Sequence, residues 1–125
     1  MPYNSDMLQK KISGFGYALK GIGIAWREEL SFQIQIIVGV LVLILSYVFH
    51  ISKNEFLIII LTVGAVLAVE TLNTALEEFC DMVKGSHDPH VAKIKDLAAG
   101  AALLISMAAF AVGCIIFLPR IAALL

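Results

Sequence analysis

Three long runs of the sequence carry no charged side chain: residues 30–49, 56–69 and 97–118. An α-helix rises about 1.5 Å per residue, so the first and third runs are each long enough to cross the roughly 30 Å hydrocarbon core of a bilayer. The composition agrees, since 60% of the residues are hydrophobic and 15% are charged, outside the range of ordinary soluble domains. The sequence therefore predicts an all-α integral membrane protein with three transmembrane helices.

A turn and a capping box define the first two predicted spans. The first covers about residues 30–50 and is followed by a short turn. Ser52 and Glu55 then form an S-x-x-E capping box, in which each side chain accepts a hydrogen bond from the other residue's backbone N–H. We expect the second helix over about residues 53–84, with its last turns projecting to or beyond the membrane interface.

A glycine and a proline separate the second span from the third. Gly85 is a natural helix stop, and Asp88 with Pro89 is a natural N-cap and first-turn pair. The third helix is predicted over about residues 89–118, and Pro119 is expected to end it. No internal repeat or linker interrupts the chain, so we expect one domain over the whole sequence.

The N-terminal segment, about residues 6–29, has the pattern of an amphipathic helix. Apolar side chains recur at alternating intervals of four and three residues, with basic side chains interleaved. Asp6 followed by Gln9 resembles a capping box at its start. We expect this helix to lie on the membrane surface, where its basic face suits the anionic cytoplasmic leaflet.

Lysine and arginine residues set the predicted orientation. Seven of the nine lie in the N-terminal segment or between the second and third spans, and Lys53 and Arg120 lie on the other side. Because cytoplasmic loops carry the excess of basic residues, we expect a cytoplasmic N-terminus and, after three spans, an external C-terminus.

Several kinds of site are not indicated. The net charge of −1 gives no global field that favours nucleic acid. Cys80 and Cys114 have neither CxxC spacing nor nearby His partners, so they are interpreted as small core residues. The sequence contains no G-x-x-x-x-G-K-[ST] loop, so a nucleotide would not be held in that familiar way.

The segment from Glu70 to Asp81, ETLNTALEEFCD, is the most informative part of the chain. At about 100° per residue, Asn73, Glu77 and Asp81 all lie within about 60° of Glu70 on one helix face. Glu70 follows fourteen uncharged residues, and ionisable groups inside a span are functional candidates. Stacked carboxylates repel one another unless cations or protons intervene, and Mg²⁺ would also bind phosphate oxygens, which points to a nucleotide.

Alternatives remain open for the surrounding charges. Glu28 or Glu29 could complete a metal site with Glu77, or could stabilise the start of the first span through the helix dipole or as a cap. Lys95 could contact phosphates or serve only the positive-inside topology. Glu78 could belong to the site or to a solvated helix end.

Two other functions compete with nucleotide chemistry. A small oligomeric transporter or channel subunit could use Glu70 as an ion or proton site, although its partner residues run toward the cytoplasm and not through the bilayer. A structural subunit that binds lipid would leave the stacked carboxylates unexplained. Transfer of label from ATP to a lipid would separate these classes.

Four segments resemble the small bacterial integral-membrane lipid kinases that phosphorylate diacylglycerol or undecaprenol. They are GYALKG at 16–21, Trp26 with Glu29, the E-x-x-N-T-A-x-E-x-x-x-D pattern at 70–81, and AKIKDLAAGAALL at 92–104. The resemblance covers nearly the whole chain. It implies a homotrimer in the bacterial cytoplasmic membrane, with active sites at the cytoplasmic interface between subunits, where MgATP phosphorylates the terminal hydroxyl of a lipid.

The resemblance also implies roles for individual residues. Glu70 would be the general base, which desolvation would make more basic, and Asn73 would arrange it and the substrate. Glu29 and Glu77 would hold Mg²⁺, and Asp81 would support this group. The implied nucleotide contacts are Lys10, Tyr17, Glu29, Glu77, Ser86, His87, Asp88, Lys95 and Asp96, and the implied lipid contacts are Lys10, Glu70 and Ala99.

The sequence departs from the family pattern at two of these places. Lys10 stands where some relatives have an Arg that touches ATP and lipid, so the charge is kept but the bidentate fork is lost. Ser86, His87 and Asp88 replace a common E-Y-H, so backbone contacts are expected there. The SKNEF start of the second helix looks slightly more like the undecaprenol branch.

Overall fold

The computed structural model describes residues 5–83 and 88–125. Its four helices are α1 (Ser5–Glu28), α2 (Leu30–Val48), α3 (Lys53–Val83) and α4 (Pro89–Ala122). The last three are long and apolar enough to cross a membrane, and the described residues contain no strand. The predicted all-α fold with three spans is therefore confirmed. Gly85, Ser86 and His87 lie outside the described residues.

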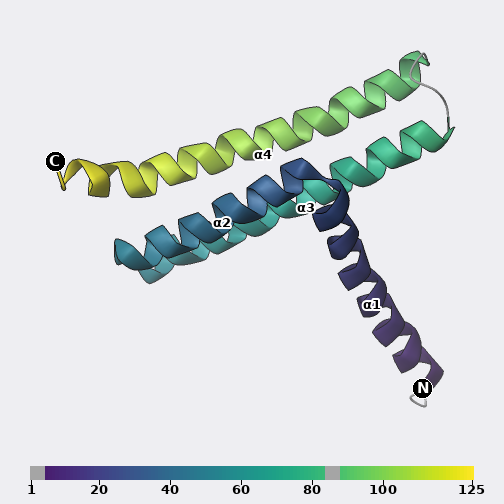
Figure 1. Ribbon diagram of the computed structural model, residues 1–125, viewed down its shortest axis with the longest axis horizontal. Helices are drawn as coiled ribbons and strands as arrows, with labels where there is room; N and C mark the ends of the chain where they lie inside the picture. The colour runs from purple at the N-terminus through teal and green to yellow at the C-terminus, as the bar shows by residue number, and fades with distance from the viewer. Residues whose placement is uncertain (1–4, 84–87) are drawn as a thin grey trace.

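Helices α2, α3 and α4 run alongside one another, whereas α1 turns away from them at its junction with α2 (Figure 1). A small apolar cluster of Ile59, Ile116 and Phe117 joins α3 to α4, and Val42 and Leu43 of α2 pack against it. Ile59 and Phe117 are only 3% and 8% exposed. This cluster holds the ends of the three spans that lie away from α1.

Two predicted helix caps are present. The Ser52 backbone N–H donates to Glu55 Oε1 at 3.1 Å, and the Glu55 backbone N–H donates to Ser52 Oγ at 3.2 Å. Asp88 accepts a hydrogen bond from the His90 backbone N–H at 2.8 Å and precedes Pro89 at the start of α4. Each cap satisfies backbone donors that the first turn of a helix leaves unpaired.

The predicted end of the third span at Pro119 is wrong, because α4 continues to Ala122. A proline removes one helical hydrogen bond, but the next residue ties this turn to its surroundings. Arg120 Nη1 donates to the Ile116 carbonyl at 2.8 Å and to Glu55 Oε2 at 2.9 Å, and Arg120 Nη2 donates to Glu55 Oε1 at 2.7 Å. The last turn of α4 is thus held to the first turn of α3.

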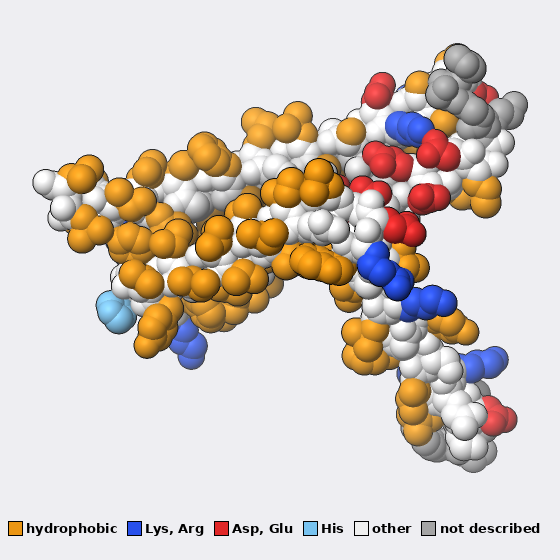
Figure 2. Space-filling view, in the orientation of Figure 1, with side chains coloured by type: hydrophobic (Ala, Val, Ile, Leu, Met, Phe, Trp, Pro, Cys, Tyr) orange, Lys and Arg blue, Asp and Glu red, His pale blue; other side chains and the backbone are white. Residues whose placement is uncertain are grey.

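Most apolar side chains of the spans face outward. In the most apolar windows of α2, α3 and α4, 17%, 11% and 11% of the residues are buried. Figure 2 shows hydrophobic side chains along the outside of these helices. Such a surface suits lipid tails, or further subunits, as its surroundings.

Candidate active site

Acidic side chains gather where the α1–α2 junction meets α3 and the beginning of α4 (Figure 2). Along α3 their exposure increases toward the end of the helix. Glu70 is only 8% exposed, Glu77 is half-buried, and Glu78 and Asp81 are exposed. The face predicted from the helical period therefore runs from a buried carboxylate to solvated ones.

Glu70 has a hydrogen-bond partner on a different helix. Gln35 of α2 donates from Nε2 to Glu70 Oε2 at 3.4 Å. Gln35 was not among the candidate site residues predicted from the sequence. The available signal was a glutamine at the sixth position of a largely apolar helix, because buried amides require partners.

The Asn73 amide contacts Glu77, one of the two predicted metal ligands. Its Nδ2 donates to Glu77 Oε1 at 3.5 Å. Asn73 Oδ1 and Gln35 Oε1 are both buried and have no hydrogen-bond partner within residues 5–83 and 88–125. Unsatisfied buried oxygens are costly, so two acceptor atoms near Glu70 and Glu77 are available to a donor or a hard cation.

Glu29 forms the link between α1 and α2. Its backbone is extended, with φ −115° and ψ 109°, and its side chain makes no capping hydrogen bond, which weakens the capping alternative. Burial raises the pKa of the Glu29 carboxyl from its ordinary value of 4.5, and the charges of Glu77 and Glu70 raise it further. Glu29 thus shares its electrostatic environment with Glu70 and Glu77 of α3.

The donor set fits a hard divalent cation. Glu29 and Glu77 supply carboxylate oxygens, and Asn73 supplies a buried amide oxygen, which are ligands that Mg²⁺ accepts. Among the described residues, no three His, Cys, Asp or Glu side chains already converge as a metal site. Mutual repulsion opposes such convergence of carboxylates until a cation offsets it.

Lys95 brings a positive charge to the same end of the molecule. Its Nζ lies 2.6 Å from Asp81 Oδ1, so the ammonium of α4 is paired with the last turns of α3. Asp88 lies half-buried at the start of α4, and Asp96 and Ala99 are exposed on α4. Asp96 lines a shallow groove along α4 together with Lys93 and Gly100.

The single chain does not bring Lys10 and Tyr17 to this cluster. Both are exposed on α1, which projects away from the bundle (Figure 1). Lys10 precedes Glu28 by eighteen residues, or about 27 Å along a helix. The predicted contacts at Ser86 and His87 fall outside the described part of the chain.

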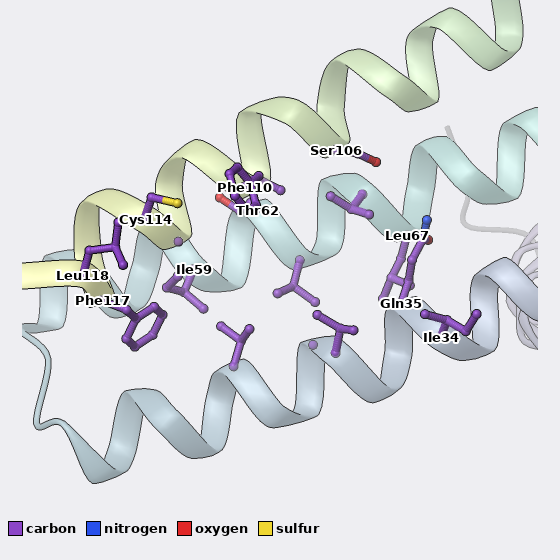
Figure 3. A pocket seen from close by; sticks show the side chains of 17 residues that line it. Ile34, Gln35, Ile59, Thr62, Leu67, Ser106, Phe110, Cys114, Phe117 and Leu118 are labelled. Atoms are coloured by element: carbon purple, nitrogen blue, oxygen red, sulfur yellow. The ribbon is translucent and has the colours of Figure 1, made fainter. Parts of the chain in front are cut away.

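An apolar cavity of about 460 Å³ lies between α2, α3 and α4. Gln35, Ile34 and Leu67 line one end, and Phe117 and Leu118 line the other (Figure 3). Its remaining lining is mostly aliphatic or aromatic. The end next to Gln35 is the end next to Glu70, since the two side chains are hydrogen-bonded.

Comparisons with known proteins agree with these features. The profile of the prokaryotic diacylglycerol kinase family matches residues 16–117. The undecaprenol kinase of Bacillus subtilis is 33% identical over 114 residues, which cover 91% of this chain and 93% of that protein. The diacylglycerol kinase of Synechocystis is 37% identical over 112 residues, covering 89% of this chain and 64% of that protein. The diacylglycerol kinase of Escherichia coli K12 is 25% identical over 116 residues, covering 93% and 95%.

The fold and these matches together define a multi-pass membrane enzyme that acts on lipid. The chain belongs to the prokaryotic diacylglycerol kinase family, as the resemblance of its motifs predicted. It is therefore a lipid kinase.

Proposed function

We propose that this protein uses ATP and Mg²⁺ to phosphorylate the terminal hydroxyl of a membrane lipid alcohol, with Glu70 as the general base. The observation that carries the proposal is the burial of the Glu70 carboxylate, only 8% exposed, at the apolar end of an acidic helix face. A hydroxyl held at the edge of the hydrocarbon would meet Glu70 first. A nucleotide arriving from water would meet Glu77 and the residues beyond it.

Individual residues are assigned separate steps of the reaction. A primary alcohol is a weak nucleophile, so Glu70 accepts its proton as the oxygen attacks the γ-phosphorus. The bond between the γ-phosphorus and the bridging oxygen breaks, and ADP leaves. Asn73, beside Glu77, orients the reacting groups. Alignment and charge neutralisation account for most of the catalysis of phosphoryl transfer.

Charge neutralisation is assigned to residues farther out. Glu29 and Glu77 would hold Mg²⁺, which neutralises charge on the phosphates when bound. Lys95 exchanges its carboxylate partner, Asp81, for a phosphate oxygen. Further nucleotide contacts are assigned to Lys10, Tyr17, Asp88 and Asp96, and to the backbone at Ser86 and His87.

These contacts are best explained by a homotrimer in which each active site combines residues of two subunits. Lys10 and Tyr17 lie on α1, which projects away from the acidic cluster of its own chain, so we propose that α1 of another subunit supplies them. We place the N-terminus in the cytoplasm and the C-terminus outside, in the bacterial cytoplasmic membrane, so that every site opens toward cytoplasmic ATP.

The substrate is a lipid alcohol of the diacylglycerol or undecaprenol type. Relatives with each activity in their names match this chain at 33% and 37% identity. Ala99 is assigned to the lipid side of the site, where its small side chain permits close approach. Rates measured side by side on the two lipids decide between them.

The test is transfer of label from γ-labelled ATP to each lipid by the purified protein in mixed micelles. Glu70→Gln should lower kcat at least about a hundredfold while leaving MgATP affinity intact. Glu77→Gln should weaken Mg²⁺-dependent nucleotide binding. Glu78→Gln is the matched control, because Glu78 is exposed beside Glu77. The absence of label in both lipids rejects the proposal, and the opposite pattern of the two variants rejects the assignment of roles.

A further inference from the structure

Gln35 is a polar side chain in a place where an apolar one would be expected. It lies in α2 between Ile34 and Ile36, within a span of high hydropathy. Its Oε1 is buried and has no hydrogen-bond partner in the part of the chain that the structure describes. An amide that served only packing would have partners for both its oxygen and its nitrogen. A leucine at this position would avoid that cost, so packing does not account for the glutamine.

The other end of the same amide contacts the proposed base. Gln35 Nε2 donates to Glu70 Oε2 at 3.4 Å, from a position thirty-five residues away in the sequence. The nearby polar groups of α3 are directed elsewhere: Thr74 Oγ1 donates to the Glu70 backbone carbonyl, and Asn73 Nδ2 donates to Glu77. Among the described residues, Gln35 is therefore the side chain that donates a hydrogen bond to the Glu70 carboxylate.

We propose that Gln35 is a positioning residue that holds one carboxylate oxygen of Glu70, so that the other oxygen faces the substrate hydroxyl. This inference rests on the proposed function of Glu70. A glutamate side chain has several rotatable bonds, and base catalysis requires hydrogen-bond geometry between the base and the hydroxyl. A donor from a second helix favours those orientations of the carboxylate in which Oε2 faces Gln35.

A neutral amide suits this task better than a charged group. Glu29 and Glu77 already place negative charge around Glu70, so a carboxylate at position 35 would add repulsion and remove the donor. A lysine or arginine would form an ion pair and make Glu70 less basic. An amide donates a hydrogen bond while leaving the charge of the base unchanged.

The location of Gln35 agrees with this role. Its side chain lines the end of the apolar cavity between α2, α3 and α4 (Figure 3). Gln35 thus lies at the boundary between hydrocarbon-lined space and the carboxylate. A hydroxyl at this boundary has the apolar lining on one side and Glu70 on the other.

The test compares Gln35→Met with Gln35→Glu in the purified full-length protein, assayed by label transfer to lipid. Methionine keeps the length of the side chain and removes the donor, so kcat should fall about tenfold to a hundredfold. KM for MgATP should stay within about twofold of the wild-type value, because the substitution removes no contact with the nucleotide. The kcat of Gln35→Glu should be lower than that of Gln35→Met, since glutamate also adds a negative charge beside Glu70.

Thermal unfolding and a control variant separate positioning from folding. Gln35→Met should unfold at the same temperature as the wild type or higher, since the variant buries no unsatisfied amide. Thr62→Val is the matched control, because Thr62 lines the same cavity and its hydroxyl donates to the Ile58 carbonyl of its own helix. It should retain wild-type kcat.

Three outcomes overturn the inference. They are a wild-type kcat in Gln35→Met, a loss of thermal stability that parallels the loss of activity, and a Gln35→Glu variant more active than Gln35→Met. None of these touches the kinase assignment, provided that the wild type transfers label. A wild type without transfer, in contrast, would reject the proposed function itself.

Discussion

At the proposed Mg²⁺ site, protonation of the Glu29 carboxyl competes with metal binding. Its pKa lies above 4.5 because of burial and because Glu77 and Glu70 carry like charges. Mg²⁺ requires the ionised carboxylate, so protons compete with the metal in a pH range above that of an ordinary glutamate. The Mg²⁺ concentration for half-maximal nucleotide binding should therefore increase as the pH falls through this raised pKa.

The raised pKa of Glu29 affects folding stability without metal in the opposite direction: a rise in pH favours Mg²⁺ binding but lowers the stability of the metal-free protein. Between 4.5 and the raised pKa the folded protein binds more protons than the unfolded chain, so stability decreases as the pH rises through this window. Glu29→Gln should weaken Mg²⁺ activation and flatten both pH dependences. Titrations of Mg²⁺ activation and thermal unfolding over pH provide the measurement, and an unchanged pH dependence in Glu29→Gln would contradict the interpretation.

At the scale of helices, the close approach of α2 to α3 depends on Gly39. A Cβ added there would lie 3.0 Å from Val63 Cγ1, which is tighter than ordinary packing. Gly39→Ala should lower stability by about 1–3 kcal/mol because the core becomes overpacked. Val63→Ala removes the obstructing methyl groups, so the double variant should recover part of that loss. Unfolding in detergent measures both, and strictly additive effects would refute the contact.

Arg120 connects the last turn of α4 to the first turn of α3. It forms two hydrogen bonds to the Glu55 carboxylate and one to the Ile116 carbonyl. Arg120→Ala should lower the Tm by several degrees while leaving KM for MgATP unchanged, since the site lies at the other end of the bundle. Arg120→Lys should recover only part of the loss, because an ammonium lacks the planar fork. An equal Tm for the wild type and the alanine variant would contradict this role.

Helices were predictable from the sequence to the extent that their signals are local. Ser52 with Glu55 and Asp88 with Pro89 start α3 and α4 as expected, since caps involve residues within one turn. The bonds between Gln35 and Glu70 and between Arg120 and Glu55 join residues 35 and 65 positions apart. Such pairs depend on the packing of helices, which a single sequence does not reveal. Pro119 failed as a stop for the same reason, because Arg120 holds the turn.

For the candidate site, the helical period predicted the shared face of Glu70, Asn73 and Glu77. The nearness of Glu29 to these carboxylates was one of two open alternatives, and its electrostatic coupling to Glu77 and Glu70 now favours it. Lys10 and Tyr17 came only from the resemblance to known kinases. Their separation from the cluster in one chain could not be predicted, because the direction of α1 is set at a single extended residue.

For the whole assembly, the proposed composite site predicts complementation between subunits. Lys10→Ala and Glu70→Gln proteins should each be nearly inactive. Mixed oligomers of the two should regain activity, because about one site in four combines an intact α1 with an intact base from a neighbour in an equal mixture. Label transfer before and after denaturation and joint refolding measures the gain. Failure to regain activity, with mixed oligomers demonstrated, would place each site within one subunit.

With the proposed base, Glu70, buried and the end of α3 exposed, the lipid and the nucleotide reach this enzyme from different phases. One reactant dissolves in three dimensions, while the other diffuses in a plane. The rate consequently follows the mole fraction of the alcohol among the membrane lipids and is insensitive to its total amount in the suspension. Diluting the bilayer with inert phospholipid acts as dilution of the substrate, whereas adding water does not.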